Sequence, residues 1–173
     1  MLIKIGRTAS VLAIVWNLPL AAQTRDDKGA PACALLTEAE IKAVTSQDPQ
    51  RSPRPAYTEA FKVKTFICNH KTANWSIKVA VDRFPTPDGP KTFFQQLKDV
   101  KQNPGNGAQT VSGLDGEAWW GPTSEEDGTL YVARGTDVIR VQSYGDAPGA
   151  ASLAKVRALM DKVLVNYGSF PKA

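Results

Sequence analysis

The side chains most often used in nucleophilic or metal chemistry are scarce, because the sequence holds one histidine and two cysteines. His70 lies between polar neighbours in a segment with turn-like composition, so we expect an exposed turn residue rather than a catalytic base. One histidine cannot build a histidine-rich zinc site, and no C-x-x-C spacing marks a redox centre. We therefore expect no catalytic residue, no metal site and no cofactor.

Paired carboxylates are the remaining route to catalysis, because two acids flanking a glycosidic bond can hydrolyse it. Asp82, Asp115 and Glu117 are the acids closest to expected strand ends. The sequence does not fix their separation, and exposed carboxylates are the simpler interpretation. A cell-wall or carbohydrate hydrolase stays open as an alternative function, as does an inhibitor of such an enzyme.

A recognition surface has more support, because aromatic residues and arginine are the usual anchors of binding interfaces. In the adjacent pair Trp119 and Trp120, the two rings must point to opposite faces of a strand. We expect Trp120 on the exposed face, since Trp119 is the more easily buried beside Leu114. The predicted binding residues are Lys78, Trp120, Tyr131, Arg140 and Tyr144. Two alternatives remain: Tyr131 and Arg140 only stack on each other, or a loop over residues 48–55 covers this face.

The first 22 residues have the pattern of a secretory signal peptide. Lys4 and Arg7 precede a short apolar run, and a small-residue site follows at Ala21-Ala22. The run is too short for a membrane span, which needs about 20 apolar residues. We expect a periplasmic or secreted protein with no stable membrane span, a flexible arm over residues 23–32, and one domain over residues 33–173.

Composition is that of an ordinary globular domain, with 42% hydrophobic and 22% charged residues. The formal net charge of +4 includes Lys4 and Arg7 of the leader, so +2 remains without them. No run of basic residues exceeds two, and nucleic-acid binding needs a concentrated basic face. We therefore expect no nucleic-acid partner.

The two cysteines of an exported chain predict one disulfide, Cys33–Cys68, although two free thiols are the alternative. The bridge would join the start of the first helix to a strand. In the chain-entropy description it would stabilise the fold by about 4 kcal/mol.

Capping and turn signals set the expected elements. Thr37 and Glu40 form a capping box, and Leu36 and Ile41 a hydrophobic staple, at the start of a helix that ends near residue 46. Apolar spacing predicts further helices over about residues 90–102 and 148–167. Alternation predicts strands over 61–68, 75–84, 117–120, 129–134 and 137–144. The prolines of residues 48–55 predict a loop.

These elements predict an α+β fold in the order α-β-β-α-β-β-β-α, with an antiparallel sheet of about five strands and the helices packed on one face. A two-residue turn at Gly135-Thr136 predicts a hairpin that pairs Val132 with Ile139 and Tyr131 with Arg140.

Short motifs distributed along the chain resemble those of small bacterial extracytoplasmic α+β domains. The sequence C-A-L-L-T-x-x-E-I opens at Cys33, a G-L-x-x-x-A-x-W-like segment lies at 113–119, and L-Y-V-x-R-G lies at 130–135. This group includes secreted lipoproteins of unknown function and sensor domains of actinobacterial receptor kinases. The second disulfide of some sensor domains and the lipobox cysteine have no counterpart in this sequence. The resemblance implies an α+β domain outside the cytoplasm, with a cysteine bridge and no reaction.

Together these observations predict a secreted or periplasmic, non-enzymatic binding domain. We expect a monomer that recognises a protein partner or a small-molecule ligand through the exposed sheet face.

Overall fold

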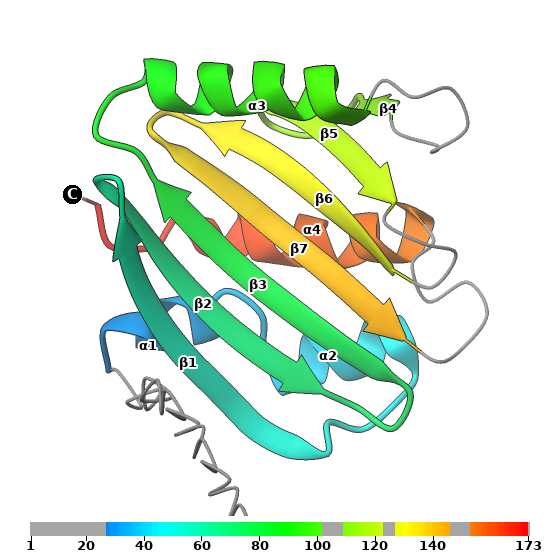
Figure 1. Cartoon of the computed structure of the whole chain (residues 1–173). Helices are drawn as coiled ribbons and strands as arrows, with labels where there is room; N and C mark the ends of the chain where they lie inside the picture. Colours follow the sequence, from blue (N-terminus) through cyan, green and yellow to red (C-terminus); the bar gives the residue numbers. More distant parts are fainter. Residues whose placement is uncertain (1–26, 102–108, 123–126, 146–152, 173) are drawn as a thin grey trace, which may run out of the picture.

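A single antiparallel sheet of seven strands organises the chain, in the order β1-β2-β3-β7-β6-β5-β4 (Figure 1). The computed structural model describes residues 27–101, 109–122, 127–145 and 153–172. The expected leader, residues 1–22, lies outside this part of the chain. The strands are β1 (Arg51–Ala60), β2 (Val63–Lys71), β3 (Trp75–Arg83), β4 (Gln109–Val111), β5 (Glu117–Pro122), β6 (Asp127–Arg134) and β7 (Asp137–Gly145).

The helical elements are η1 (Asp27–Gly29), α1 (Ala30–Cys33), α2 (Glu38–Thr45), α3 (Asp88–Lys101) and α4 (Leu153–Tyr167). Helices α1, α2 and α4 lie behind the sheet in Figure 1 and cover one of its faces, which we call the inner face. The predicted class, α+β with an antiparallel sheet, is confirmed. None of the described helices is long and apolar enough to cross a bilayer.

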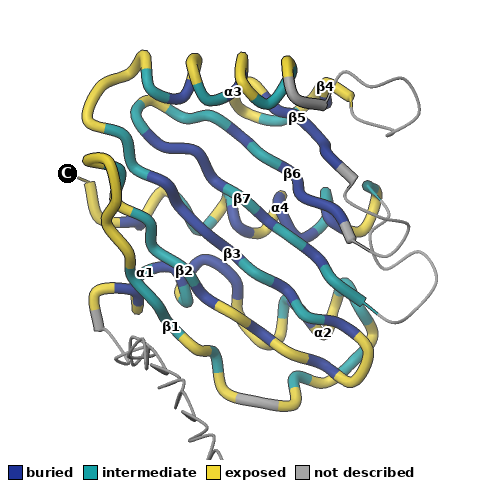
Figure 2. Tube along the Cα trace, viewed as in Figure 1, coloured by how far each residue is buried: buried dark blue, intermediate teal, exposed yellow. Residues whose placement is uncertain are grey.

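The main core fills the space between the inner face and these helices. Alternate residues of the central strands, such as Val79, Leu130 and Val141, are fully buried against Val156 and Leu159 of α4. Figure 2 shows this burial concentrated in the middle strands, whereas β1 is largely exposed. The apolar spacing predicted for the last helix is thus the spacing of its core contacts.

Helix α3 packs on the opposite side of the sheet, which we call the outer face. Phe94 is buried in a second cluster with Trp119 and Val138, and Phe93 packs against it. The expectation that all helices share one face is therefore wrong. Two phenylalanines in an otherwise polar helix need an apolar surface, and β5, β6 and β7 provide one on the outer face.

The sheet has two strands more than the five expected, because β1 and β4 were missed. Pro53 and Pro55 suggested a loop, yet both lie within β1. A proline that donates no ladder hydrogen bond is tolerated on an edge strand, and β1 is the edge beyond β2. Strand β4 has three residues at the other edge, too few for a clear alternation.

Residues 27–32 were expected to belong to a flexible arm, but they form η1 and the start of α1. Ala32 is fully buried. A Cβ on Gly29 would lie 2.3 Å from the carbonyl oxygen of Ala56, so only glycine allows this close approach to β1.

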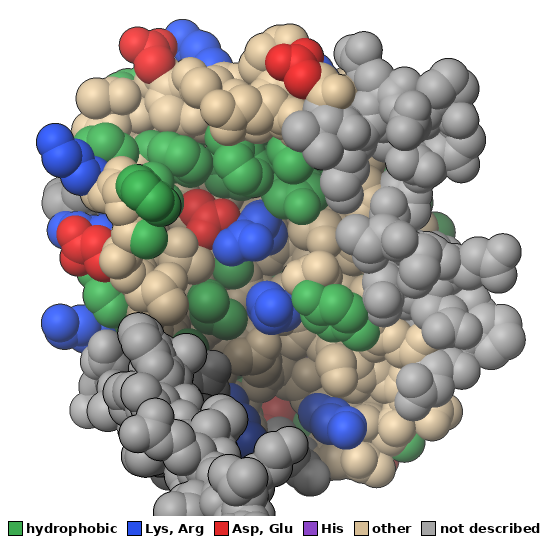
Figure 3. Space-filling model, viewed as in Figure 1, with side chains coloured by type: hydrophobic (Ala, Val, Ile, Leu, Met, Phe, Trp, Pro, Cys, Tyr) green, Lys and Arg blue, Asp and Glu red, His purple; other side chains and the backbone are tan. Residues whose placement is uncertain are grey.

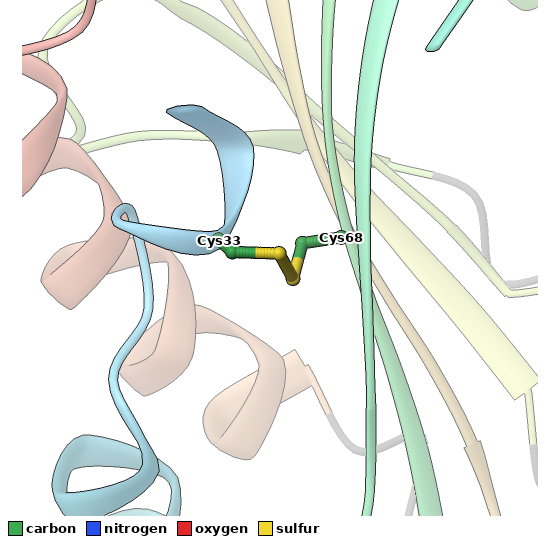
Figure 4. The surroundings of a disulfide bond; sticks show 2 residues. All are labelled: Cys33 and Cys68. Atoms are coloured by element: carbon green, nitrogen blue, oxygen red, sulfur yellow. A yellow bond between two sulfur atoms is a disulfide. The ribbon is translucent and has the colours of Figure 1, made fainter. Parts of the chain in front are cut away.

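The predicted disulfide is confirmed: Cys33 of α1 is bonded to Cys68 of β2 (Figure 4). The capping box is also present, since Thr37 Oγ1 accepts from the Glu40 amide and Glu40 Oε2 accepts from the Thr37 amide. Strands β6 and β7 pair in the predicted register, with Tyr131 opposite Arg140. These features depend on contacts near in sequence, or on the one possible pairing of two cysteines.

Candidate functional site

Trp119 and Trp120 point to opposite faces of the sheet, as expected. Each of them, however, lies on the face that we predicted for the other. Trp120 lies in the main core and is 5% exposed, whereas Trp119 lies on the outer face. The register of β5 explains this, because Trp119 stands directly opposite Tyr131. Side chains directly opposite each other share a face. Trp120 is therefore withdrawn as a binding residue.

Tyr131 occupies the outer face as predicted, but helix α3 covers it. Its ring lies 5.8 Å from the ring of Phe93 and 5.9 Å from that of Trp119, measured between centroids. Burial raises the pKa of its phenol. Tyr131 is thus a member of the second apolar cluster rather than of an open surface.

Arg140 lies next to this covered region and forms an ion pair. Its Nε lies 2.6 Å from Oδ2 of Asp82, and its Nη2 donates to Oδ1 of the same carboxylate at 2.9 Å. Thr65 Oγ1 also donates to Asp82 Oδ1, at 2.8 Å. Because Asp82 neutralises Arg140, this guanidinium contributes little net charge to the outer face.

The part of the outer face that α3 leaves uncovered contains a groove of about 220 Å³, which we call the basic groove. It lies between β1, β2, β3 and β7, at the end of the β2–β3 hairpin. Figure 3 views this face, with hydrophobic side chains gathered below α3 and Lys and Arg side chains nearer the hollowed middle. The groove is lined by Ser52, Arg54, Asn69, His70, Lys71, Ser76, Ile77, Lys78 and Tyr144.

Strand pairing explains why residues distant in sequence meet in the basic groove. Arg54 pairs with Asn69, and Asn69 pairs with Lys78, so these three form one row across β1, β2 and β3. Ser76 joins Lys71 to Tyr144 in the next row. Neighbouring strands lie about 4.8 Å apart, which brings the long basic side chains within reach of one bound group.

Lys78 and Tyr144 are the two predicted site residues that the structure brings together. Lys78 Nζ lies 3.4 Å from the Tyr144 hydroxyl oxygen and 5.5 Å from the centroid of its ring. Both side chains are partly exposed. The pair forms one wall of the basic groove, with the ammonium placed beside a polar and aromatic surface.

The basic groove has three cations, Arg54, Lys71 and Lys78, and no acidic residue among its lining residues. None of the three forms a salt bridge with an acid of the described chain. Three cations in one hollow, without an acidic partner among the described residues, create a local positive potential that attracts anions. The sequence analysis missed Arg54 and Lys71, because the prolines beside Arg54 concealed β1 and Lys71 lay in an expected turn.

His70 is not the exposed turn residue that we predicted. It lies in β2, is 3% exposed, and burial lowers its pKa to about 4. Among the described residues, neither ring nitrogen has a hydrogen-bond partner. Two residues from Cys68, its side chain shares the inner face with the disulfide. The strand extends three residues beyond Cys68, where the predicted strand ended, and this extension buries the imidazole.

A smaller hollow of about 190 Å³ adjoins the basic groove. The two share Lys71, Ser76 and Tyr144. The second hollow is completed by Ala73, Asn74, Trp75 and Gly145. It contains a single cation and, like the basic groove, no acid among its lining residues.

The turn between β2 and β3 carries the second hollow and is held by Gln47. Gln47 Oε1 accepts from Thr72 Oγ1 at 2.7 Å and from the Asn74 amide at 3.2 Å. Thr72 Oγ1 in turn accepts from the Trp75 amide at 3.1 Å. These bonds fix the backbone around Asn74, so the shape of the hollow is set before any ligand enters.

No group of three or more potential metal ligands occurs within the described residues. The three acids considered for hydrolysis are instead held in separate ion pairs: Asp82 with Arg140, Asp115 with Arg134, and Glu117 with Lys98. Asp82 and Glu117 lie on strands three places apart in the sheet, which separates their backbones by about 14 Å. Paired glycosidase carboxyls lie about 5–9.5 Å apart, so Asp82 and Glu117 do not fit the hydrolase alternative.

No family model matches the chain, and no curated protein matches it. Among solved structures, the chain is similar to the crystal structure of the extracellular domain of PknH from Mycobacterium tuberculosis. The TM-score is 0.44 and the sequence identity is 16%, over 79% of this chain and 96% of that chain.

Proposed function

We propose that this chain is an extracytoplasmic, non-enzymatic domain that binds a small anionic ligand in the basic groove. The observation that carries the proposal is the meeting of Arg54, Lys71 and Lys78 in one hollow that no acidic residue lines within the described part of the chain. Cations that lie close together repel one another in the free protein, and a bound anion relieves this repulsion. Of the predicted site residues, Lys78 and Tyr144 are retained.

A non-catalytic function agrees with the chemistry of the groove. Its lining residues offer cations, hydroxyls and an amide, but no carboxylate or thiol. The only imidazole, that of His70, shares the inner face with Cys68. A general base or nucleophile would have to lie among the groove residues in order to act on a bound ligand. The lining residues with partly exposed side chains are suited instead to binding an anion.

The test is a titration of the purified protein with inorganic phosphate and with citrate, followed by two-dimensional amide NMR. As the anion concentration rises, we expect the shifts of the groove amide signals to increase and then reach a plateau. These signals are those of Asn69, Lys71, Ser76, Lys78 and Tyr144. Lys78→Gln should weaken binding about tenfold, since a charge-assisted hydrogen bond contributes about 1.5–3 kcal/mol. The affinity should also fall as ionic strength rises.

The matched control is Lys64→Gln, which removes a lysine from the neighbouring strand β2, at the end of that strand away from the basic groove. This variant should bind both anions as the unchanged protein does. If neither anion shifts the groove signals, or if the Lys64 and Lys78 variants weaken binding equally, the proposed function is wrong.

A further inference from the structure

The basic groove and the second hollow differ in the charge of their lining residues. This difference indicates which class of ligand would fit both. Arg54, Lys71 and Lys78 all line the basic groove, whereas Lys71 is the only charged residue among the described residues that line the second hollow. Around Lys71, the second hollow presents the polar residues Asn74 and Ser76 and the aromatic residue Tyr144. One end of the site is suited to a charged group and the other to a neutral, polar one.

The arrangement of the cations favours a doubly charged group over a carboxylate. Lys78 and Arg54 approach from strands on either side of β2, and Lys71 lies two residues along β2 from the intervening Asn69. A phosphate monoester carries a charge of about −1.5 to −2 at neutral pH and three peripheral oxygens. It can therefore engage three cations at once. A carboxylate has one charge and two oxygens, and it would leave a cation uncompensated.

The size of the two hollows favours a ligand that occupies both. Their volumes are about 220 and 190 Å³, each below the roughly 300–1,000 Å³ typical of ligand sites. Inorganic phosphate alone would leave the second hollow unused. A hydroxyl-rich ring could exchange hydrogen bonds with Asn74 and Ser76 and place its C–H surface against Tyr144.

We infer that the ligand is a sugar phosphate, with its phosphate monoester among Arg54, Lys71 and Lys78 and its sugar ring in the second hollow beside Asn74 and Tyr144. This inference rests on the proposed function and adds the class of ligand. Because Gln47 fixes the turn around Asn74, the sugar meets a preformed hollow rather than one that must be ordered on binding.

The experiment compares three kinds of probe by isothermal titration calorimetry at low ionic strength. These are inorganic phosphate, the 6-phosphates of glucose, mannose and N-acetylglucosamine, and the same sugars without phosphate. At least one sugar phosphate should bind ten times more tightly than inorganic phosphate, and no free sugar should bind measurably. The affinity should fall below pH 6, where the phosphate monoester takes up a proton and its charge falls from −2 to −1.

Two variants separate the ends of the site. Asn74→Ala should lower the affinity for the sugar phosphate towards that for inorganic phosphate, and it should leave phosphate binding unchanged. Lys78→Gln should weaken both. Asn74 is exposed, and its backbone bond to Gln47 survives the substitution, so the variant should fold normally. The same Lys64→Gln control should bind like the unchanged protein.

The outcomes distinguish the inference from the proposed function. If inorganic phosphate binds as tightly as every sugar phosphate, the site is for a simple anion and the sugar-phosphate inference is overturned, while the proposed function stands. The same holds if citrate binds more tightly than all of the sugar phosphates. If no anion binds at all, both proposals fail together.

Discussion

Asp82 of β3 and Arg140 of β7 form an ion pair of 2.6 Å that divides the outer face of the sheet in two. On one side lies the apolar cluster beneath α3, and on the other lies the basic groove. Because Arg140 is neutralised where it stands, the positive charge of the groove comes from Arg54, Lys71 and Lys78 alone. The pair lies at the boundary between the apolar region beneath α3 and the basic groove.

Breaking this pair should destabilise the fold. Asp82 is 7% exposed, so Asp82→Asn leaves a partly buried guanidinium without its counter-charge. We expect a loss of about 1–3 kcal/mol in the free energy of unfolding, measured by urea denaturation. The control is Asp88→Asn, which removes an exposed ion pair with Lys91 and should change stability by less than about 0.5 kcal/mol. Equal stability of the two variants would show that the Asp82 pair has no such role.

Tyr131 should matter for stability rather than for binding. Tyr131→Ala removes a ring that contacts Phe93 and Trp119, and we expect it to cost about 2–4 kcal/mol. Tyr131→Phe keeps the ring and should cost less than about 1.5 kcal/mol. Thermal or urea unfolding measures both. A Tyr131→Ala variant with unchanged stability and weakened anion binding would restore Tyr131 to the binding site.

Substitution of Asp137, a carboxylate of the inner face, should cause a large loss of folding stability. It is 1% exposed and accepts hydrogen bonds from Arg83 at 2.7 Å and from the Tyr167 hydroxyl at 2.8 Å. Asp137→Ala should therefore cost about 3–5 kcal/mol, because Arg83 loses its partner in a buried setting. Tyr167→Phe removes only one bond and should cost about 1–3 kcal/mol.

The Tyr167 hydroxyl also predicts that folding stability falls at alkaline pH. Burial and its bond to Asp137 raise the pKa of Tyr167 to about 12. The unfolded chain loses this proton above about pH 10, so between pH 10 and 12 this group makes folding less favourable as pH rises. Tyr167→Phe should reduce the slope of stability against pH in that range. A matched control is Tyr57→Phe, whose hydroxyl bonds the exposed Glu59; if both variants show the same slope, Tyr167 is not the source.

His70 predicts a loss of stability in mild acid. Its pKa is lowered to about 4 in the folded protein, while the unfolded chain binds the proton near pH 6.5. The unfolded state therefore binds more protons between these values, and stability should fall as pH drops from 6.5 to 4, by at most about 3 kcal/mol. His70→Phe should remove this component, since neither ring nitrogen has a partner to lose in the part of the chain that the structure describes. Parallel pH profiles for the two proteins would refute the assignment.

Short sequence motifs correctly predicted the helix ends, turns and bonds that their own residues form. The capping box at Thr37, the hairpin turn at Gly135 and the cysteine pair each specify a contact through residue type and short spacing, and each is present. The long apolar stripe of α4 was equally clear. These predictions succeeded because the physical cause lies within the segment itself or admits one solution.

The errors arose where position within the sheet decides the outcome. Pro53 and Pro55 exclude a central strand but not an edge strand, and a single sequence does not reveal which strand will be the edge. The choice between Trp119 and Trp120 depends on pairing with Tyr131, which is a contact between strands. The groove cations Arg54 and Lys71 belong to the same problem, because only the neighbouring strand brings them beside Lys78.

The contact of Gly29 with Ala56 and the two prolines of β1 act on the same edge of the sheet. Prolines remove hydrogen-bond donors there, and the N-terminal segment lies against the backbone of the same strand. A binding partner therefore has little opportunity to add a strand of its own to β1. The opposite edge is the three-residue β4, which offers only a short template. Both edges thus favour partners that recognise side chains rather than backbone, and they disfavour self-assembly into extended sheets.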